Sequence, residues 1–409
     1  MKRERKYHRM KSYYIESIIN QMALAIQDLI TKQAITNSDK IILYGMDTLS
    51  FGMKTILANE GYKIEGYITD NEILCMQMKR HLKASVSRYV RKSRDMVFIG
   101  SVKERLIPFD PEVKVLIADR NYEIIRNELI LLGYEENRHF YCVYDQKKDD
   151  FADLVANKKK LTVREIQEDI KPLLKMVDDF CNENRIRYWV CGGTMLGTIR
   201  HKGFIPWDDD VDIFMPWQDY QRFVREFKDN ERYELIGPDK CDRKDYFELF
   251  SKLIDKKTIV REKSAHVNKI HPIAVDIFPL IGLPDKSEER KLFFAQYYEM
   301  EKAIWEDFYK HNGDVSVYNE WYPKQKAFLE KYDFDKADYV GVLATAYQDR
   351  DCTTRQVYSE TLRMPFEDME VNVPVGYKEY LDNLYGSNWM ELPEESKRNS
   401  HHHMEAYWL

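Results

Sequence analysis

The sequence predicts an α/β protein built from two units. Over residues 1–150, short apolar strands alternate with helical segments, which is typical of a parallel, doubly wound sheet. A charged run at 145–160 then marks a linker. Residues 160–409 follow a different pattern, in which an apolar strand, a glycine pair, a helix and an acidic strand come in succession. This second unit is expected to be α+β, with helical additions toward its C-terminal end.

The first unit resembles a Rossmann-like domain. Its opening residues look helical as far as residue 36. Its turn at 45–52 departs from the dinucleotide-binding pattern, because Asp47 stands where a second glycine would admit pyrophosphate. We therefore expect no bound NAD, and a scaffold, an oligomerisation unit and a sugar-nucleotide site remain alternatives. Strands are expected over 40–44, 64–68, 96–99, 113–118 and 141–144, and helices over 49–59 and 121–132.

The second unit begins with a helix that a capping box starts at Thr162 and Glu165. A strand over 188–191 follows, and then Gly192 and Gly193, which allow the backbone to approach a ligand closely. A helix expected to begin at Thr194 would offer free N–H groups to phosphate. A Gly-Gly pair alone usually marks only a turn, so its meaning depends on what comes next. The helix stripe that should pack behind this strand consists of Ile166, Ile170, Leu173, Leu174, Val177 and Phe180.

An acidic strand comes about fifteen residues after the glycines. Asp210 and Asp212 are two apart, so in a strand they share a face. Asp208 would extend the row if the strand began early, and Asp209 would face away. Carboxylates this close need a cation between them, and oxygen ligands without Cys or His favour Mg²⁺ or Mn²⁺. The alternative is a solvated acidic turn, which the apolar residues that follow make less attractive.

A third acid, Asp276, stands inside the apolar strand 274–280 and needs a partner there. That partner is either a metal shared with the acidic pair or a salt bridge to Lys or Arg. Between the glycines and the acids, Arg200 and Lys202 add cationic groups that suit donor phosphates. The alternative is that they are surface charges, which is what we expect of His201 and Lys202.

These residues resemble the signature of a known family. The segment YWVCGGTMLGTIRHKGFIPWDDDVDIFMPWQDYQRF at 188–223 is similar to the core of the LicD-type transferases, and VDIFPL at 275–280 resembles their second block. Weaker similarity at 251–260 and 366–393 extends the resemblance over roughly residues 160–400. The segment 271–274 departs from the family, which has a glycine-containing turn there. The resemblance implies a nucleotidyltransferase-fold catalytic domain at 160–409.

The resemblance also implies an activity. Family members transfer an alcohol phosphate, with phosphocholine as the first candidate, from a CDP-activated donor to a hydroxyl of a cell-surface glycan or its lipid-linked precursor, releasing CMP. Choline, ethanolamine, glycerol and ribitol are not distinguished by these residues. Alternatives are a nucleotidyltransferase that moves NMP to a sugar or alcohol, and an inactive glycan- or nucleotide-binding module. The pattern assigns donor-phosphate binding to Gly192, Gly193, Thr194, Arg200 and Lys252, and metal binding and catalysis to Asp210, Asp212 and Asp276. Asp276 would either complete the Mg²⁺ or Mn²⁺ site or accept a proton.

Composition limits the partners. The 63 basic and 69 acidic residues leave a net charge of −6, which argues against a nucleic-acid binder. Six scattered cysteines without a Cys-x-x-Cys motif fit reduced thiols in the cytoplasm. No apolar run approaches the roughly twenty residues of a membrane span. The basic start, Lys2 to Lys11, is not a secretory signal and is best explained as a solvated helix face. It leaves peripheral contact with the inner face of an anionic membrane open, as the first unit leaves homo-oligomerisation open.

Overall fold

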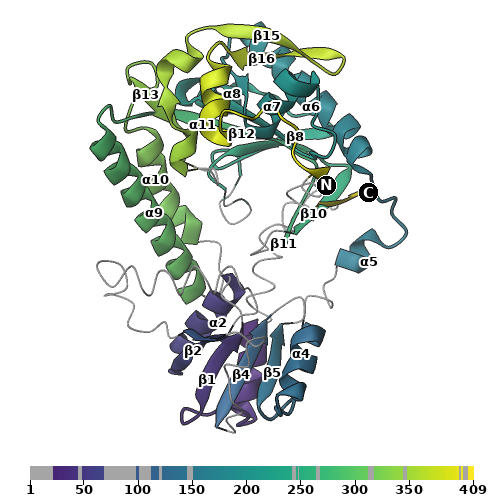
Figure 1. Cartoon of the computed structure of the whole chain (residues 1–409), viewed down its shortest axis with the longest axis vertical. Helices are drawn as coiled ribbons and strands as arrows, with labels where there is room; N and C mark the ends of the chain where they lie inside the picture. The colour runs from purple at the N-terminus through teal and green to yellow at the C-terminus, as the bar shows by residue number, and fades with distance from the viewer. Residues whose placement is uncertain are drawn as a thin grey trace.

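The structure is a computed structural model of the whole chain (Figure 1). The residues that it describes are 22–44, 48–68, 98–100, 112–118, 122–144, 151–241, 246, 248–263, 268–311, 317–343, 348–395, 398 and 404–409.

The first unit contains a five-stranded sheet in the order β3-β2-β1-β4-β5. Every neighbouring pair in it is parallel, as the alternation of strands and helices predicts. In Figure 1 it forms the lower part of the molecule. Its strands are β1 (Lys40–Tyr44), β2 (Ile64–Ile68), β3 (Phe98–Gly100), β4 (Val113–Ala118) and β5 (Phe140–Tyr144).

Helices pack on both faces of this sheet. Alternate residues of a strand point to opposite faces, so Ile41 and Leu43 share an apolar cluster with α2 (Thr48–Asn59). Ile42 shares a different cluster with α4 (Tyr122–Leu131). Burial on both faces is why these strands are continuous apolar runs rather than alternating ones.

The N-terminal expectations hold with small corrections. Residues 22–31 are helical, but a turn follows in which Gln33 has a φ of 56°, so the helix expected to reach residue 36 is too long. The segment before residue 22 and residues 45–47, which include Asp47, lie outside the described residues. Other boundaries move by at most two residues.

The second unit is organised around two parallel strands, β7 (Val211–Pro216) and β12 (Ala274–Leu283). On the outer side of β7 lies the antiparallel β6 (Trp189–Val190). The first half of β12 pairs with β9 and the second half with β13, both antiparallel. The sheet is therefore mixed, with outer strands β8 (Tyr233–Ile236), β9 (Ser251–Asp255), β13 (Tyr339–Gly341) and β14 (Thr353–Thr354).

Three helices belong to this sheet: α6 (Val163–Asn184), α7 (Gly192–His201) and α8 (Trp217–Glu226). The capping box of Thr162 and Glu165 at the start of α6 is confirmed, with each side chain bonded to the other's backbone N–H. The predicted stripe of α6 is buried, apart from its last member, Phe180, which is partly buried. This helix packs against β9 and β12, behind the acidic strands.

The expectation of a mostly helical chain beyond residue 290 is correct only to residue 329. Two helices, α9 (Ser287–Lys310) and α10 (Val317–Leu329), come first. Beyond them the chain is mixed, because 361–366 alternates exposed and covered side chains and pairs in a hairpin with 369–374, whose last four residues are buried. These later elements are η3 (Gln348–Asp351), η4 (Arg355–Tyr358), β15 (Thr361–Phe366), β16 (Met369–Pro374), α11 (Tyr377–Tyr385) and β17 (Glu405–Trp408).

The C-terminal strand β17 returns to the sheets of the second unit. It pairs with β10 (Thr258–Lys263), whose other neighbour is β11 (Asn268–His271). The expected linker holds a short helix, α5 (Phe151–Val155). Phe151 packs edge-on against Tyr407 of β17, at a ring-centroid distance of 5.9 Å. The linker is therefore partly ordered against the second unit.

Helix α9 reaches the first unit (Figure 1). The amide of Asn59 on α2 donates to the carbonyl of Lys310, 3.1 Å away. Ile304 and Phe308 of α9 and Tyr318 of α10 belong to the same apolar cluster as α2. The two units therefore share an apolar core in addition to the chain that connects them.

The cysteines that the structure describes are 142, 181, 191, 241 and 352, and none of these five is in a disulfide, as expected. No helix within the described ranges has both the length and the apolar character needed to cross a membrane.

Candidate active site

Two of the predicted acids are brought together by the sheet. Asp212 on β7 and Asp276 on β12 are partners in register on adjacent parallel strands. Adjacent strands lie about 4.8 Å apart and partners project to the same face, so the two carboxylates are neighbours. Asp210 precedes the first residue of β7, two positions before Asp212. The acids are thus gathered at the beginning of both strands.

A lysine reaches this cluster from the opposite side of β12. Lys252 of β9 is the antiparallel partner of Asp276, and its Nζ contacts both carboxylate oxygens of that residue. Both side chains are largely buried. Nζ also lies 4.9 Å from the centre of the Phe250 ring. Of the two partners expected for Asp276, this structure supplies the salt bridge, and its lysine is the one that the family resemblance singled out.

A small cavity of about 40 Å³ lies beside this pair. That volume holds an ion with water but not a nucleotide, so a donor would occupy open space beyond it. The cavity is lined by Asp209, Asp210, Lys252, His271, Ile273, Ala274, Asp276 and Met404.

Two expectations about the neighbouring acids are wrong. Asp209 does not face away: it is buried and lines the cavity. Asp208 does not extend the row on the strand, because β7 begins only at Val211. Residues 208–210 precede the strand, so the two-residue alternation of side chains does not apply to them.

The glycine pair faces these acids. It opens α7 itself, so the helix begins two residues earlier than the expected Thr194. Gly192 has a φ of +51°, and a Cβ there would lie 3.5 Å from Oδ2 of Asp212. A Cβ on Gly193 would lie only 2.6 Å from Oδ2 of Asp208. Glycine is therefore favoured at 192 by backbone conformation, whereas a Cβ at 193 would displace the Asp208 carboxylate.

The N–H groups of Gly192, Gly193 and Thr194 form the predicted phosphate cradle. One of them, that of Gly192, is already hydrogen-bonded within the protein. The N–H of Gly192 donates to Oη of Tyr380, 3.2 Å away, and the Tyr380 hydroxyl donates to Oδ1 of Asp351, 3.1 Å away. Tyr380 and Asp351 are both buried. Sequence reasoning missed both, although Tyr380 lies in the family-like segment 366–393. The first intrahelical hydrogen bond of α7 is donated by the N–H of Met195. The N–H groups of Gly193 and Thr194 precede it, in the first turn, where a helix offers N–H groups to a ligand.

The side chain of Thr194 joins the helix to the acidic strand. Its hydroxyl accepts the N–H of Asp212 at 2.9 Å, and the carbonyl of Asp212 accepts the N–H of Cys191 at 3.0 Å. These two bonds fix the position of the first turn of α7 relative to Asp212. Thr194 can therefore offer a phosphate its backbone N–H, while its hydroxyl positions the strand.

Arg200 is not brought beside the glycine pair. It lies eight residues further along α7, about 12 Å along the axis. Its Nη1 donates to the carbonyls of Trp389 and Glu391, at 2.7 and 3.1 Å, and burial lowers its pKa. In this structure Arg200 anchors the segment after α11.

The donor set of the site suits a hard cation. The acidic side chains of the site are carboxylates, the oxygen ligands that Mg²⁺ and Mn²⁺ prefer. Within the described ranges no three Asp, Glu, His or Cys side chains are already assembled as metal ligands, and Lys252 contacts Asp276. Burial, reinforced by the charge of Asp212, raises the pKa of the nearby Cys191 thiol, so this cysteine stays neutral.

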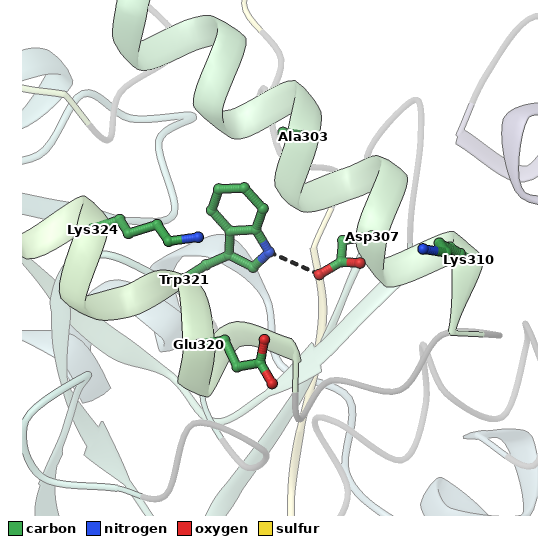
Figure 2. Close-up of a pocket in the computed structure, with 6 residues that line it drawn as sticks. All are labelled: Ala303, Asp307, Lys310, Glu320, Trp321 and Lys324. Atoms are coloured by element: carbon green, nitrogen blue, oxygen red, sulfur yellow. Dashed lines mark hydrogen bonds between the residues drawn. The ribbon is translucent and has the colours of Figure 1, made fainter.

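A larger hollow of about 380 Å³ lies between α9 and α10 (Figure 2). Trp321 projects into it, donating through Nε1 to Oδ2 of Asp307 at 2.9 Å, with Nζ of Lys324 3.9 Å from its ring. The neighbouring Tyr322 is buried in the core. Hydrophobic packing is therefore the role of Tyr322 in this structure. Trp321 combines packing with a polar contact.

Comparison with known proteins identifies relatives of the second unit. The family model described as LicD/FKTN/FKRP, nucleotidyltransferase domain, matches residues 185–334, which include the glycine pair and both acidic strands. The lipopolysaccharide cholinephosphotransferase LicD of Haemophilus influenzae is 30% identical over 273 residues, covering 61% of this chain and 100% of that protein. An uncharacterized protein of Rickettsia typhi is 36% identical over 77 residues, which is 18% of this chain and 23% of that protein. An uncharacterized protein of Rickettsia prowazekii is 38% identical over 65 residues, which is 16% of this chain and 22% of that protein.

Proposed function

This chain belongs to the LicD family, and from that membership and the geometry of its acidic site we propose that it transfers phosphocholine from CDP-choline to a hydroxyl of a cell-surface glycan or its lipid-linked precursor. CMP is the second product. The observation that carries the proposal is that Asp212 and Asp276 are partners on adjacent parallel strands, and that Asp212 lies next to the glycine pair. The full-length match to a lipopolysaccharide cholinephosphotransferase supports both the transferred group and the kind of acceptor.

The metal in this proposal is Mg²⁺ or Mn²⁺, held by Asp210 and Asp212, with Asp276 as the third candidate ligand. When bound, it would offset the negative charge of the donor diphosphate and of the departing CMP. The three carboxylates that line the cavity and its room for an ion support this assignment.

The protein's own groups would bind and orient the donor. The N–H groups of Gly193 and Thr194, at the start of α7, would donate to phosphate oxygens, and the Lys252 ammonium would supply positive charge nearby. In the transfer, a bond forms between the acceptor oxygen and phosphorus while the bond from phosphorus to the CMP oxygen breaks. The proton of the acceptor hydroxyl passes to a carboxylate of the cavity.

We also propose the division of the chain into residues 1–150, with a Rossmann-like fold, and 160–409, with a nucleotidyltransferase fold. The parallel sheet and the mixed sheet support this division. The first unit would then serve as a scaffold or as an oligomerisation unit. A glycan acceptor linked to a lipid would bring the enzyme to the inner face of the membrane.

A CMP-release assay tests the proposal. The full chain is incubated with Mg²⁺ and CDP-choline, CDP-ethanolamine, CDP-glycerol or CDP-ribitol, and we expect slow release of CMP from CDP-choline. EDTA and Asp210→Asn should each abolish the signal, whereas Asp239→Asn should not, because Asp239 pairs with Lys326 outside the site. Undiminished release in Asp210→Asn would refute the mechanism.

The same reaction separates the alternative of nucleotidyl transfer. With an acceptor glycan present, phosphocholine transfer increases the product mass by phosphocholine, and nucleotidyl transfer increases it by a nucleotide. An inactive binding module would show donor-induced thermal stabilisation with no CMP.

A further inference from the structure

The pair of Lys252 and Asp276 lies where the acidic site would bind its cation. The two side chains are only 10% and 21% exposed, and Nζ contacts both carboxylate oxygens. The same cavity is lined by Asp209 and Asp210. Carboxylates buried this close together raise the free energy of the fold unless a cation offsets them, and Lys252 offsets Asp276.

We propose that Lys252 is a built-in counter-ion that exchanges with the metal. In the metal-free protein its ammonium neutralises Asp276, and on loading of a divalent cation it leaves that carboxylate and turns to the donor diphosphate. This inference rests on the proposed function, because it takes the site to bind Mg²⁺ or Mn²⁺. It differs from a permanent structural salt bridge, in which the ammonium would stay on Asp276 throughout.

The local structure permits such an exchange. The backbone of Lys252 is fixed on β9 by pairing with β12 on one side and β8 on the other, so only the side chain can move. Its four-carbon stem is flexible, and the Phe250 ring lies 4.9 Å from Nζ. The face of that ring attracts a cation and offers the ammonium a second contact when it leaves the carboxylate.

Metal affinity distinguishes the two roles. Mn²⁺ binding to the full chain is measured by electron paramagnetic resonance for wild type and for Lys252→Met, which keeps the length of the side chain and removes its charge. An ammonium that competes for Asp276 weakens metal binding, so we expect Lys252→Met to lower the Kd for Mn²⁺ at least about tenfold. CMP release by the same variant should fall, because the donor loses a positive charge.

Two variants control this measurement. Lys256→Met removes a lysine from the turn after the same strand, where Nζ donates to the carbonyl of Asn230 at 3.1 Å, and should leave the Kd unchanged. Asp210→Asn should weaken binding. An unchanged or weaker Mn²⁺ affinity in Lys252→Met overturns the exchange while leaving the proposed function standing. If the wild-type protein binds no Mn²⁺, both the exchange of Lys252 and the metal-dependent function are overturned.

A labelling experiment on wild type covers the case in which Lys252→Met does not fold. Acetic anhydride acetylates exposed lysines, and mass spectrometry of peptides gives the rate at Lys252, with Lys256 as internal reference. We expect saturating Mg²⁺ to raise the rate at Lys252 severalfold, and added CDP-choline to lower it again. An unchanged rate at Lys252 under conditions where Mn²⁺ binds identifies the pair as a permanent salt bridge.

Discussion

The N–H of Gly192 donates to the hydroxyl of Tyr380, 188 residues further along the chain. That hydroxyl in turn donates to the buried Asp351. A residue of α11 therefore fixes the backbone of the glycine turn next to Asp212, whose Oδ2 would lie 3.5 Å from a Cβ on Gly192. Tyr380 acts through Gly192 and is a positioning residue for the predicted phosphate cradle.

Replacing Tyr380 by Phe should lower both turnover and stability. The ring stays packed, but both hydrogen bonds of the hydroxyl are lost, so we expect a loss of about 1–3 kcal/mol in the free energy of unfolding. Release of the glycine turn should raise the KM for CDP-choline and lower kcat by about tenfold or more. Steady-state CMP release and urea denaturation measure the two effects.

Tyr377→Phe is the matched control on the same helix. Among the contacts of the described residues, Tyr377 packs against the core and is not bonded to Gly192 or Asp351. Its variant should behave like wild type. Equal kinetics for the Tyr380 and Tyr377 variants would contradict the positioning role.

Gly193→Ala should impair donor binding with little effect on folding. The backbone of Gly193 is outside the left-handed region, so alanine fits the helix, but its Cβ would lie 2.6 Å from Oδ2 of Asp208. The carboxylate can rotate away, so we expect a stability change within about 1 kcal/mol. Isothermal titration with CDP-choline should show weaker binding.

A double-mutant cycle identifies the cause. If Gly193→Ala acts by displacing Asp208, then Asp208→Ala in the same chain adds little further loss, and the two effects are not additive. Fully additive losses would show that the new methyl group obstructs the donor itself.

Asp169 makes stability depend on pH. Burial, helped by the charge of Asp255, raises the pKa of Asp169 to about 6. Because the folded chain retains this proton above the ordinary pKa of 3.8, the stability contributed by Asp169 is present at low pH and declines as pH rises toward 6. Asp169→Asn should therefore stabilise the protein at pH 7.5, on the order of 1–2 kcal/mol, and have little effect near pH 4.

Thermal unfolding of both proteins at pH 4.5, 6 and 7.5 measures this difference. Asp179→Asn is the control, because Asp179 lies on the same helix with half of its side chain exposed and pairs with Lys175. A stabilisation by Asp169→Asn of the same size at all three pH values would be incompatible with the raised pKa.

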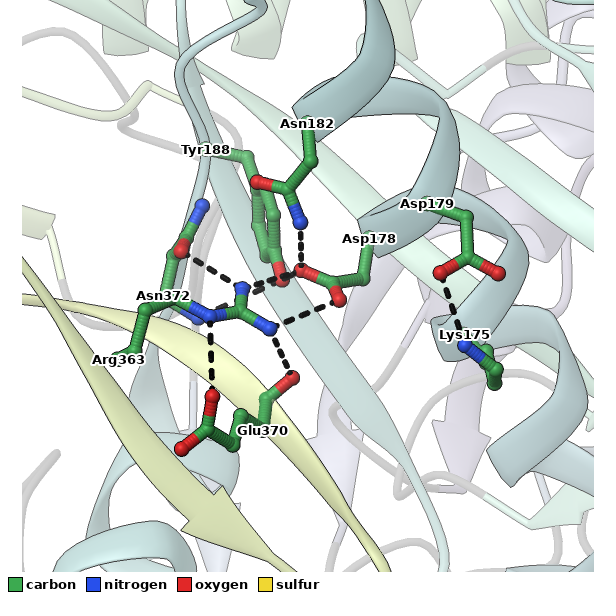
Figure 3. Close-up of polar contacts among 8 residues, drawn as sticks. All are labelled: Lys175, Asp178, Asp179, Asn182, Tyr188, Arg363, Glu370 and Asn372. Carbon is green, nitrogen blue, oxygen red and sulfur yellow. Dashed lines mark hydrogen bonds and ion pairs between the residues drawn. The ribbon is translucent and has the colours of Figure 1, made fainter.

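The hairpin of β15 and β16 is attached to α6 through Arg363 (Figure 3). Nη2 of Arg363 donates to Oδ2 of the buried Asp178 at 3.0 Å, and Nη1 of Arg363 donates to Oδ1 of Asn372 at 2.8 Å. Asp178 also accepts the hydroxyl of Tyr188, just before β6. Arg363→Met leaves a buried carboxylate without its cation and should cost about 3 kcal/mol in the free energy of unfolding.

Urea denaturation tests this cost. Adding Asp178→Asn to Arg363→Met removes the uncompensated charge and should recover part of the loss. Lys175→Met breaks the exposed pair with Asp179, at 2.8 Å, and should leave stability nearly unchanged because water screens this pair. A loss in Arg363→Met no larger than in Lys175→Met would contradict the importance of the buried pair.

Local patterns in the sequence account for most of the elements. Apolar runs of five or six residues predict β1 and β4, and the Thr162–Glu165 box predicts the start of α6, because these signals depend on neighbours within one turn or strand. The failures also have local causes. The acids at 208–210 look like part of a strand but precede it, and the alternation at 361–366 is a strand signal inside a region expected to be helical.

By itself, the sequence determined that the chain is α/β, that a glycine pair precedes an acidic strand, and which carboxylates are candidates for chemistry. Only the tertiary structure decided which groups meet. Lys252 contacts Asp276 because β9 pairs with β12 in one register, and Gly192 meets Tyr380 because α11 packs on the core. Strand register and helix docking depend on the packing of the whole core, and the pattern around a single residue does not specify them.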